Sequence, residues 1–280
     1  MLQLVECPRD AMQGIKLFIP TDLKVKYLNA LLKVGFHTLD FGSFVSPKAI
    51  PQLRDTHQVV SQLEMTDTHL LSIVANVRGA EEAVRHEEIK YIGFPFSISE
   101  TFQLRNTRAT IDQSLERVKH IQSICLSNNK VLVVYISMGF GNPYGDVWSE
   151  EIVSKWVEEL IDLDITIIAL SDTIGVANPA SISRIFSHLV PAYASTQFGA
   201  HFHTRPDMWK EKVLAATEAG CTRFDGAIGG FGGCPMAKDE LVGNMPMESL
   251  LDFFDQNVFE SDEWMEVVEL NTYIFSTYTT

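Results

Sequence analysis

The stretch Gln197-Phe198-Gly199-Ala200-His201-Phe202-His203 is a short apolar run that ends in two histidines separated by one residue. In a β-strand, residues i and i+2 point to the same face and lie roughly 6.6 Å apart along the strand. His201 and His203 would therefore direct both imidazoles into one space, a spacing typical of metal ligands. An isolated His-x-His pair also arises by chance, and the alternative is a pair of solvent-facing or core histidines. The rest of the sequence decides between these interpretations.

Seven other short apolar runs have the same character, and longer segments with helical periodicity separate them. One of these segments begins with Asn178 and Pro179, a helix-start signal, and two others end at Gly35 and Gly220. We therefore predict eight strands, at residues 2–7, 38–41, 69–74, 91–94, 131–136, 165–170, 197–203 and 223–227.

Strands that alternate with helices are joined in parallel, and eight such repeats in about 230 residues fit a (β/α)8 TIM barrel. A doubly wound open sheet is the alternative, but it commonly carries a glycine-rich turn after its first strand, where this chain has Pro8-Arg9-Asp10. We expect an α/β protein with a single barrel domain over residues 1–257. Residues 258–280 are expected to form a C-terminal helix and tail packed on the barrel, and a candidate homodimer contact.

The composition limits the partners that the protein can have. Of its 280 residues, 46% are hydrophobic, which is enough for a large core. Its 22 basic and 36 acidic residues give a net charge of −14, which argues against nucleic acid or an anionic membrane as a partner. The four cysteines form no Cys-x-x-Cys motif, and the chain has neither a basic leader nor a long apolar window. These features favour a reducing compartment, and we expect a cytoplasmic protein.

Polar residues follow nearly every predicted strand. In a barrel, the residues just past the carboxyl ends of the strands converge on one face, which is where such proteins bind and react with substrates. In chain order these residues are Arg9, Asp10 and Gln13; Asp40 and Ser43; Asn76; Ser97 and Ser99; Ser137; Ser171, Asp172 and Thr173; His201 and His203; and a glycine-rich stretch that ends in Cys234.

Three of these residues, Asp10, His201 and His203, supply one carboxylate and two imidazoles, and an amide oxygen from Asn244 can join them. Two nitrogen donors and several oxygen donors, with positions left open, favour an octahedral Mg²⁺ or Mn²⁺ over a closed zinc site. Arg9, beside Asp10, places a cation where negative charge can develop on a substrate oxygen. The alternative interpretation is a turn residue for Asp10 and a surface ion pair for Arg9.

Cys234 lies between the stretch Gly229-Gly230-Phe231-Gly232-Gly233 and Pro235. This setting favours a thiol presented over the site as a proton donor or acceptor, whereas a small buried thiol is the alternative. The other cysteines lack such a setting, and we interpret them as structural; they are Cys7, Cys125 and Cys221.

In the order and spacing of these motifs, over roughly residues 4 to 250, the chain resembles hydroxymethylglutaryl-CoA lyase, within the metal-dependent TIM-barrel lyases and acyl synthases. Two motifs are specific to the lyase: the run Ser43-Phe44-Val45-Ser46-Pro47-Lys48 and the loop Gly232-Gly233-Cys234-Pro235. The wider superfamily shares Arg9-Asp10 and the His201/His203 pair. Further matches are Gln13, Asn76 with Gly79, Ser99-Glu100, Ser171-Asp172-Thr173-Ile174-Gly175-Val176 and Gly243-Asn244.

The resemblance implies a retro-Claisen cleavage of 3-hydroxy-3-methylglutaryl-CoA to acetyl-CoA and acetoacetate. It implies a divalent cation, Mg²⁺ or Mn²⁺, and catalytic roles for Arg9 as the cation that stabilises the departing enolate and for Cys234 as an acid or base. An acidic residue at the end of the second strand also lines the site in this family, and Asp40 occupies that place. The implied cation ligands are Asp10, His201, His203 and Asn244, and the catalytic set also includes Asp10, Asp40, Asp172 and His201.

Two departures from the family pattern lie at the site. The family usually has glutamate where this chain has Asp40, and aspartate where this chain has Thr204 after the His-x-His pair. A carboxylate that orients a cation ligand is therefore either missing or supplied from elsewhere. Two alternatives stay open at this point: a related aldolase or acyl-CoA-dependent synthase, and a catalytically degenerate barrel that binds acyl-CoA or metal.

An acyl-CoA substrate needs local cations in so acidic a protein. Lys48, Arg78 and Arg105 follow the second, third and fourth strands on the active-site side, and we consider them candidates for contact with the CoA phosphates. Solvated surface charge is the alternative for each of the three.

Overall fold

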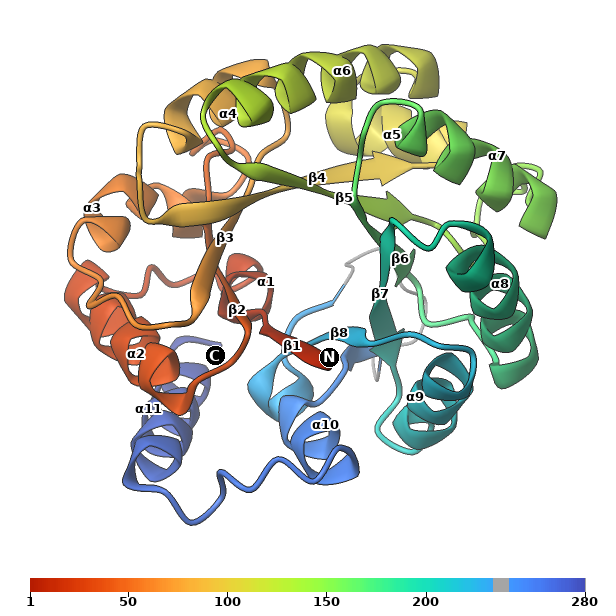
Figure 1. Ribbon diagram of the computed structural model, residues 1–280. Helices are drawn as coiled ribbons and strands as arrows, with labels where there is room; N and C mark the ends of the chain where they lie inside the picture. The colour runs from red at the N-terminus through yellow and green to blue at the C-terminus, as the bar shows by residue number, and fades with distance from the viewer. Residues whose placement is uncertain (234–241, 280) are drawn as a thin grey trace.

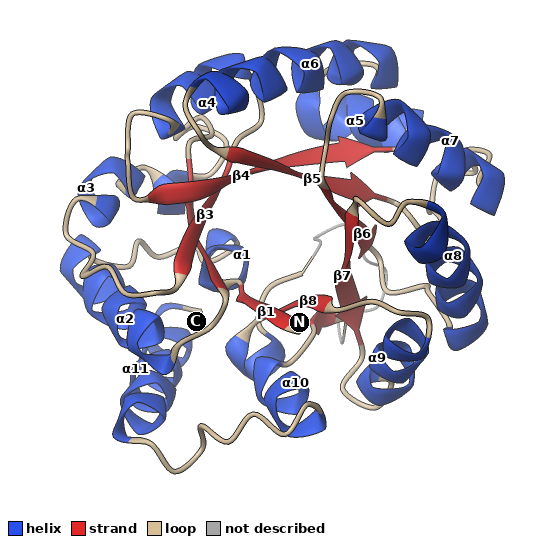
Figure 2. Ribbon diagram, in the orientation of Figure 1, coloured by secondary structure: helices blue, strands red, loops and turns tan. Residues whose placement is uncertain are grey.

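Eight parallel strands close into a barrel in the computed structural model, which describes residues 1–233 and 242–279 (Figures 1 and 2). The first strand pairs with both the second and the eighth, and the sixth with the seventh, so the sheet has no free edge. This closure confirms the TIM barrel and excludes the open doubly wound sheet. The barrel strands are β1 (Gln3–Glu6), β2 (Thr38–Ser43), β3 (His69–Ile73), β4 (Ile89–Ser97), β5 (Val131–Ser137), β6 (Ile167–Asp172), β7 (Gln197–Thr204) and β8 (Arg223–Gly226).

Helices surround the barrel as an outer layer (Figure 2). They are α1 (Pro8–Gln13), α2 (Thr21–Val34), α3 (Thr56–Val60), α4 (Val77–Ala83), α5 (Glu100–Thr107), α6 (Ile111–Ser127), α7 (Glu150–Ile161), α8 (Pro179–Ala192), α9 (Trp209–Glu218), α10 (Met247–Phe253) and α11 (Asp262–Tyr278). Two single-turn 3-10 helices, Pro51–Leu53 and Ile228–Gly230, complete the described elements.

The sequence located each barrel strand to within a few residues. The helix signals also hold: Asn178 forms a capping box with Ser181 at the start of α8, and Gly35 ends α2 in the left-handed conformation, with φ of 88°. The sequence did not predict β9 (Gly243–Asn244), which pairs with β7 in the antiparallel direction. Two residues are too few to give an alternating pattern.

Alternation along the strands divides the buried residues into two sets. Outward-facing residues such as Ile92, Phe94 and Val134 pack against the helices and belong to the main core. Inward-facing apolar residues form a smaller cluster in the barrel, comprising Leu71, Tyr91, Val133, Tyr135, Ile167 and Ala169. The interior also holds buried charged residues from β2 and β8, namely Asp40, Arg223 and Asp225. The barrel interior is therefore partly ionic, and this ionic part lies close to the candidate site.

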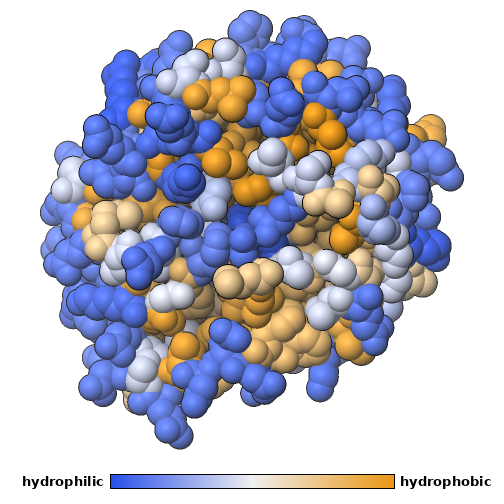
Figure 3. Space-filling model, viewed as in Figure 1, coloured by the Kyte–Doolittle hydropathy of each residue, from blue (hydrophilic) through white to orange (hydrophobic). Residues whose placement is uncertain are grey.

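The surface is mostly hydrophilic where the helices face solvent. In the view of Figure 3, hydrophilic side chains cover most of the periphery, and apolar side chains show mainly nearer the middle of this face. No helix within the described residues is both long enough and apolar enough to cross a membrane.

The C-terminal helix α11 lies beside α2 (Figure 1). The Tyr27 hydroxyl of α2 donates a hydrogen bond to Asn271 Oδ1 of α11 at 2.9 Å. Further along α11, the Phe275 ring stacks on Phe231 with the ring centroids 4.1 Å apart and the planes 4° from parallel. The helix therefore contacts both the outer layer of the barrel and the glycine-rich loop after β8.

We predict that Ile274→Ala destabilises the protein by about 2–5 kcal/mol, because it removes methyl groups from a side chain that α11 buries completely. The measurement is the free energy of unfolding by chemical denaturation. Met265 lies on the same helix but is 63% exposed, so Met265→Ala is the matched control, with an expected change within about 0.5 kcal/mol. Equal losses in the two variants would contradict the docking of α11.

Candidate active site

Two elements bring one carboxylate and two imidazoles together at the carboxyl end of the barrel. Asp10 lies in α1, directly after β1, and His201 and His203 lie on the inward face of β7. One ligand atom from each of the three side chains lies within 4.8 Å of the others. The grouping that the His-x-His spacing indicated therefore exists in the folded protein. We call these three residues the Asp-His-His cluster.

Asn244 joins this cluster from β9, where it pairs in register with His203. Its Nδ2 atom donates to Asp10 Oδ2 at 2.7 Å and to the main-chain carbonyl oxygen of Phe231 at 2.8 Å. The carbonyl oxygen can only accept, so it fixes which end of the amide carries the nitrogen. With both N–H groups committed, Oδ1 is the atom of Asn244 that can bind a cation.

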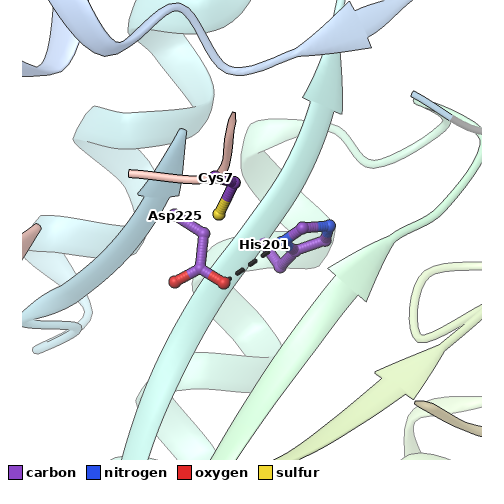
Figure 4. Close-up of side chains that lie close together, drawn as sticks. All are labelled: Cys7, His201 and Asp225. Carbon is purple, nitrogen blue, oxygen red and sulfur yellow. Dashed lines mark hydrogen bonds and ion pairs between the residues drawn. The ribbon is translucent and has the colours of Figure 1, made fainter. Parts of the chain in front are cut away.

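Hydrogen bonds on the far side of each ring set the tautomers of the two histidines. His203 Nδ1 lies 2.8 Å from the main-chain oxygen of Thr173, and His201 Nδ1 lies 3.1 Å from Asp225 Oδ2 (Figure 4). Both of these oxygens accept, so each Nδ1 carries a proton, and in the neutral form of each ring Nε2 keeps its lone pair. His203 Nε2 is buried with no hydrogen-bond partner within the described part of the chain. A buried nitrogen that is left unpaired in this way fits a metal ligand.

Arg9 is held in place by three side chains. Its Nε donates to both carboxylate oxygens of Asp40, at 3.2 and 3.0 Å, and its Nη2 donates to Asp40 Oδ2 at 2.6 Å. Its Nη1 donates to Asp10 Oδ1 and to Gln13 Oε1, both at 2.9 Å. The guanidinium is thus locked beside the cluster, and the shorter Asp40 reaches it without a bridging water. The surface ion pair that we considered for Arg9 is wrong, because Arg9 and Asp40 are both buried.

The charges of these groups follow from burial and from their neighbours. Burial raises the pKa of Asp10, but the Arg9 charge, followed by those of His201 and His203, outweighs this and lowers the pKa to about 2. Burial raises the pKa of Asp40 to about 6, because it exceeds the attraction of Arg9. At neutral pH both carboxylates are therefore ionised. Burial, reinforced by His201, lowers the pKa of His203 and keeps that imidazole neutral.

Asp225 is the site residue that the sequence reasoning missed. It lies on β8, inside a predicted strand, and its carboxylate orients His201 from outside the cluster. It supplies the carboxylate that Thr204 does not provide. The available signal was the spacing of Arg223 and Asp225, two charged residues on one face of an otherwise apolar strand.

Several polar residues at the strand ends have structural contacts instead. Asp172 accepts from Lys212 Nζ at 2.7 Å and from the Val176 main-chain N–H at 2.8 Å, so its carboxylate faces α9 rather than the cluster. Asn76 and Ser99 accept hydrogen bonds at the starts of α4 and α5 as N-cap residues. The same polar strand-end pattern therefore marks both site residues and helix caps.

The remaining candidates lie apart from the cluster. Lys48 is exposed in the loop after β2, and Arg78 in α4 pairs with Glu82 at 2.9 Å. The Arg105 guanidinium in α5 lies over the Tyr144 ring, 4.7 Å from its centroid. Cys234 lies outside the described residues.

Residues 3–261 match the family model described as HMGL-like. The chain is 32% identical over 251 residues to the hydroxymethylglutaryl-CoA lyase YngG of Bacillus subtilis, a match that covers 89% of this chain and 83% of that protein. It is 30% identical to the mitochondrial hydroxymethylglutaryl-CoA lyase of Arabidopsis thaliana, over 87% of this chain and 52% of that protein.

Solved structures give the same picture. An HMG-CoA lyase from Acinetobacter baumannii, in complex with coenzyme A and 3-methylmalate, superposes with a TM-score of 0.87 at 34% identity and covers 99% of this chain and 90% of that chain. The HMG-CoA lyase of Bacillus subtilis superposes with a TM-score of 0.90 at 29% identity and covers 99% of this chain and 93% of that chain.

We predict that Asp225→Asn weakens the binding of a divalent cation by about 10- to 100-fold, because the amide no longer fixes the tautomer of His201. Mn²⁺ binding followed by electron paramagnetic resonance is the measurement. Asp207 has a side chain that is 68% exposed, so Asp207→Asn is the control and should bind Mn²⁺ as the parent protein does. Unchanged affinity in Asp225→Asn would remove Asp225 from the site.

Proposed function

Since the chain belongs to the HMGL-like family, we propose that it is a carbon–carbon lyase that cleaves 3-hydroxy-3-methylglutaryl-CoA to acetyl-CoA and acetoacetate. The observation that carries this proposal is the Asp-His-His cluster with the locked guanidinium of Arg9 beside it. The names of the relatives support the same substrate. The alternatives of a synthase and of a degenerate barrel have no comparable support.

The residues present fit a divalent cation, which we propose to be Mg²⁺ or Mn²⁺. Asp10, His201, His203 and the Asn244 amide oxygen would hold it, a mixed nitrogen and oxygen set typical of these ions when positions stay open for substrate. The neutral imidazole of His203 and the ionised Asp10 are in the protonation states that ligation requires. Burial lowers the pKa of His201, but Asp225 and then Asp10 outweigh this and raise it, so His201 would give up any proton on Nε2 when the ion binds. When bound, such an ion lowers the pKa of a coordinated hydroxyl group.

In the proposed reaction the tertiary hydroxyl of the substrate loses its proton as the bond between C2 and C3 breaks. The bonding electrons move onto the thioester as an enolate, and protonation at C2 then gives acetyl-CoA, while C3 becomes the ketone of acetoacetate. Arg9 is placed for the charge that develops on the thioester oxygen, because Asp40, Asp10 and Gln13 already fix its orientation.

Cys234 is proposed as the acid or base of these proton transfers, although it lies outside the described residues. The loop before it supports this role. A Cβ atom at Gly232 would come within 2.7 Å of Asn244 Nδ2 and 2.8 Å of the Asp10 carbonyl oxygen, and φ of Gly232 is +88°. Only glycine allows the loop to lie this close to the cluster, two residues before Cys234.

For Asp172 we propose a positioning role. Lys212 Nζ donates to Asp172 Oδ2 at 2.7 Å and to the main-chain oxygen of His203 at 3.0 Å. Through Lys212, Asp172 therefore holds the end of β7, on which the histidines lie.

We also propose a cytoplasmic homodimer without nucleic-acid or membrane partners. The acidic net charge and the free, buried thiols of Cys7, Cys125 and Cys221 support this. On α11, Met265 and Tyr273 are exposed apolar side chains that a second copy could cover.

The test of the function is to incubate the purified protein with Mg²⁺ or Mn²⁺ and 3-hydroxy-3-methylglutaryl-CoA and to measure acetoacetate. We expect turnover, and we expect Arg9→Lys to lower kcat by about 10²- to 10³-fold, because lysine cannot reproduce the forked contacts of Arg9. Absence of acetoacetate with every divalent cation tried would refute the lyase.

Lys48, Arg78 and Arg105 are proposed to contact the CoA phosphates, and we predict that their alanine variants raise KM for the CoA ester with little change in kcat. Each lies on the loop or helix that follows a barrel strand on the active-site side. Lys119 on α6 is a suitable control, since it is an exposed lysine paired with Glu116. A KM that stays at the parent value in all three variants would show that these side chains do not contact the CoA phosphates.

A further inference from the structure

A second group of potential ligands lies on the other side of the His201 ring. Cys7 follows β1, Asp225 lies on β8, and His201 lies on β7, so three neighbouring strand ends contribute one side chain each. One ligand atom from each lies within 4.8 Å of the others. Cys7 and Asp225 are 1% and 3% exposed. The group is therefore compact and shielded from solvent.

This group and the Asp-His-His cluster share His201 but use different atoms of it. In Figure 4 the Cys7 sulfur and the Asp225 carboxylate stand on the side of His201 Nδ1, which is the nitrogen that donates to Asp225 Oδ2. The Nε2 atom is the one that the proposed function assigns to Mg²⁺ or Mn²⁺. One imidazole therefore separates two sets of donors.

The second group has binding capacity that the protein itself does not use. Asp225 Oδ1 is buried without a hydrogen-bond partner among the described residues, and its ion pair with Arg223 Nε is long, at 3.9 Å. The Cys7 thiol has a long contact of 3.6 Å with the carbonyl oxygen of Val5. Buried polar atoms without partners are rare in folded proteins and call for an explanation.

We propose that Cys7, His201 Nδ1 and Asp225 form a second cation site, which takes a thiophilic divalent cation such as Zn²⁺ or Cd²⁺. These ions accept a thiolate together with an imidazole and a carboxylate, whereas Mg²⁺ does not favour a thiolate ligand. Binding releases the thiol proton of Cys7 to solvent, and the proton on Nδ1 of the neutral His201 ring moves to Nε2. No electron transfer is involved.

The shared imidazole makes the two sites antagonistic. A cation on Nδ1 replaces the proton that His201 donates to Asp225, and with it the hydrogen bond that presents Nε2 to the Asp-His-His cluster. Occupation of the second site therefore weakens the binding of Mn²⁺ at the first. The second site acts as an inhibitory site for thiophilic metals.

The test is a titration of metal-free protein with Cd²⁺, followed by the ultraviolet charge-transfer absorption that only a sulfur–cadmium bond gives. All samples carry Cys234→Ser, so that the loop thiol cannot contribute. We expect a band that saturates at one Cd²⁺ per chain, is lost in Cys7→Ser, and persists in Cys125→Ser and Cys221→Ser, which remove the other two buried thiols. A band that persists in Cys7→Ser, or no band in the parent, would overturn the proposal.

Two further measurements keep the result interpretable. Cys7→Ser should still bind Mn²⁺, which shows that the variant is folded and that the first site is intact, and Cd²⁺ should displace this Mn²⁺ less readily than in the parent. If Cys7→Ser does not fold, cadmium NMR of the parent decides, because its chemical shift distinguishes a sulfur ligand from nitrogen and oxygen ligands alone. A shift without sulfur overturns the proposal. None of these measurements depends on lyase activity, so the second site and the proposed function can fail separately.

Discussion

The site depends on a buried ionic network in which one guanidinium faces two carboxylates. Arg9 is paired with both Asp40 and Asp10, and all three side chains are removed from solvent. Burying charge is costly unless the charges are paired and hydrogen-bonded. Here Arg9 Nε and Nη2 donate hydrogen bonds to Asp40, and Arg9 Nη1 donates to Asp10. One positive and two negative charges still leave the network with an excess of one negative charge. This excess favours a cation beside Asp10, to which the two imidazoles add nitrogen ligands that carry no charge once they bind it.

The closed barrel is what allows such a network to form. Closure sets β7, β8 and β1 side by side, so residues far apart in the chain meet across neighbouring strands. Polar atoms without a hydrogen-bond partner among the described residues, such as His203 Nε2 and Asp225 Oδ1, lower stability relative to an apolar interior. The apolar layer between strands and helices offsets this cost, since nearly all of the large aliphatic core lies there.

The sequence predicted the fold well because its signals are local. Eight apolar runs and the helix signals between them depend on neighbours in the chain, and parallel pairing of eight units then favours closure. The proximity of His201 and His203 was predictable for the same reason, because residues i and i+2 of one strand point to the same face. The orientation of His201 by Asp225 was not readable, because it depends on the register between β7 and β8. Asp172 illustrates the opposite case. It lies at a strand end, as a site residue would, but its carboxylate accepts a hydrogen bond from Lys212, forty residues later in the chain.

The C-terminal helix is also connected to the site, although the sequence gave no sign of it. The Phe231 ring stacks on Phe275 of α11, and the carbonyl oxygen of Phe231 accepts one of the two hydrogen bonds that orient the Asn244 amide. The other goes to Asp10. A Cβ at Gly229 would meet the Phe231 ring at 2.5 Å, so the ring is confined between that glycine and α11. The position of one carbonyl oxygen beside the cluster is therefore set from the outer layer of the barrel, and α11 belongs structurally to the site even though none of its residues lies in the Asp-His-His cluster.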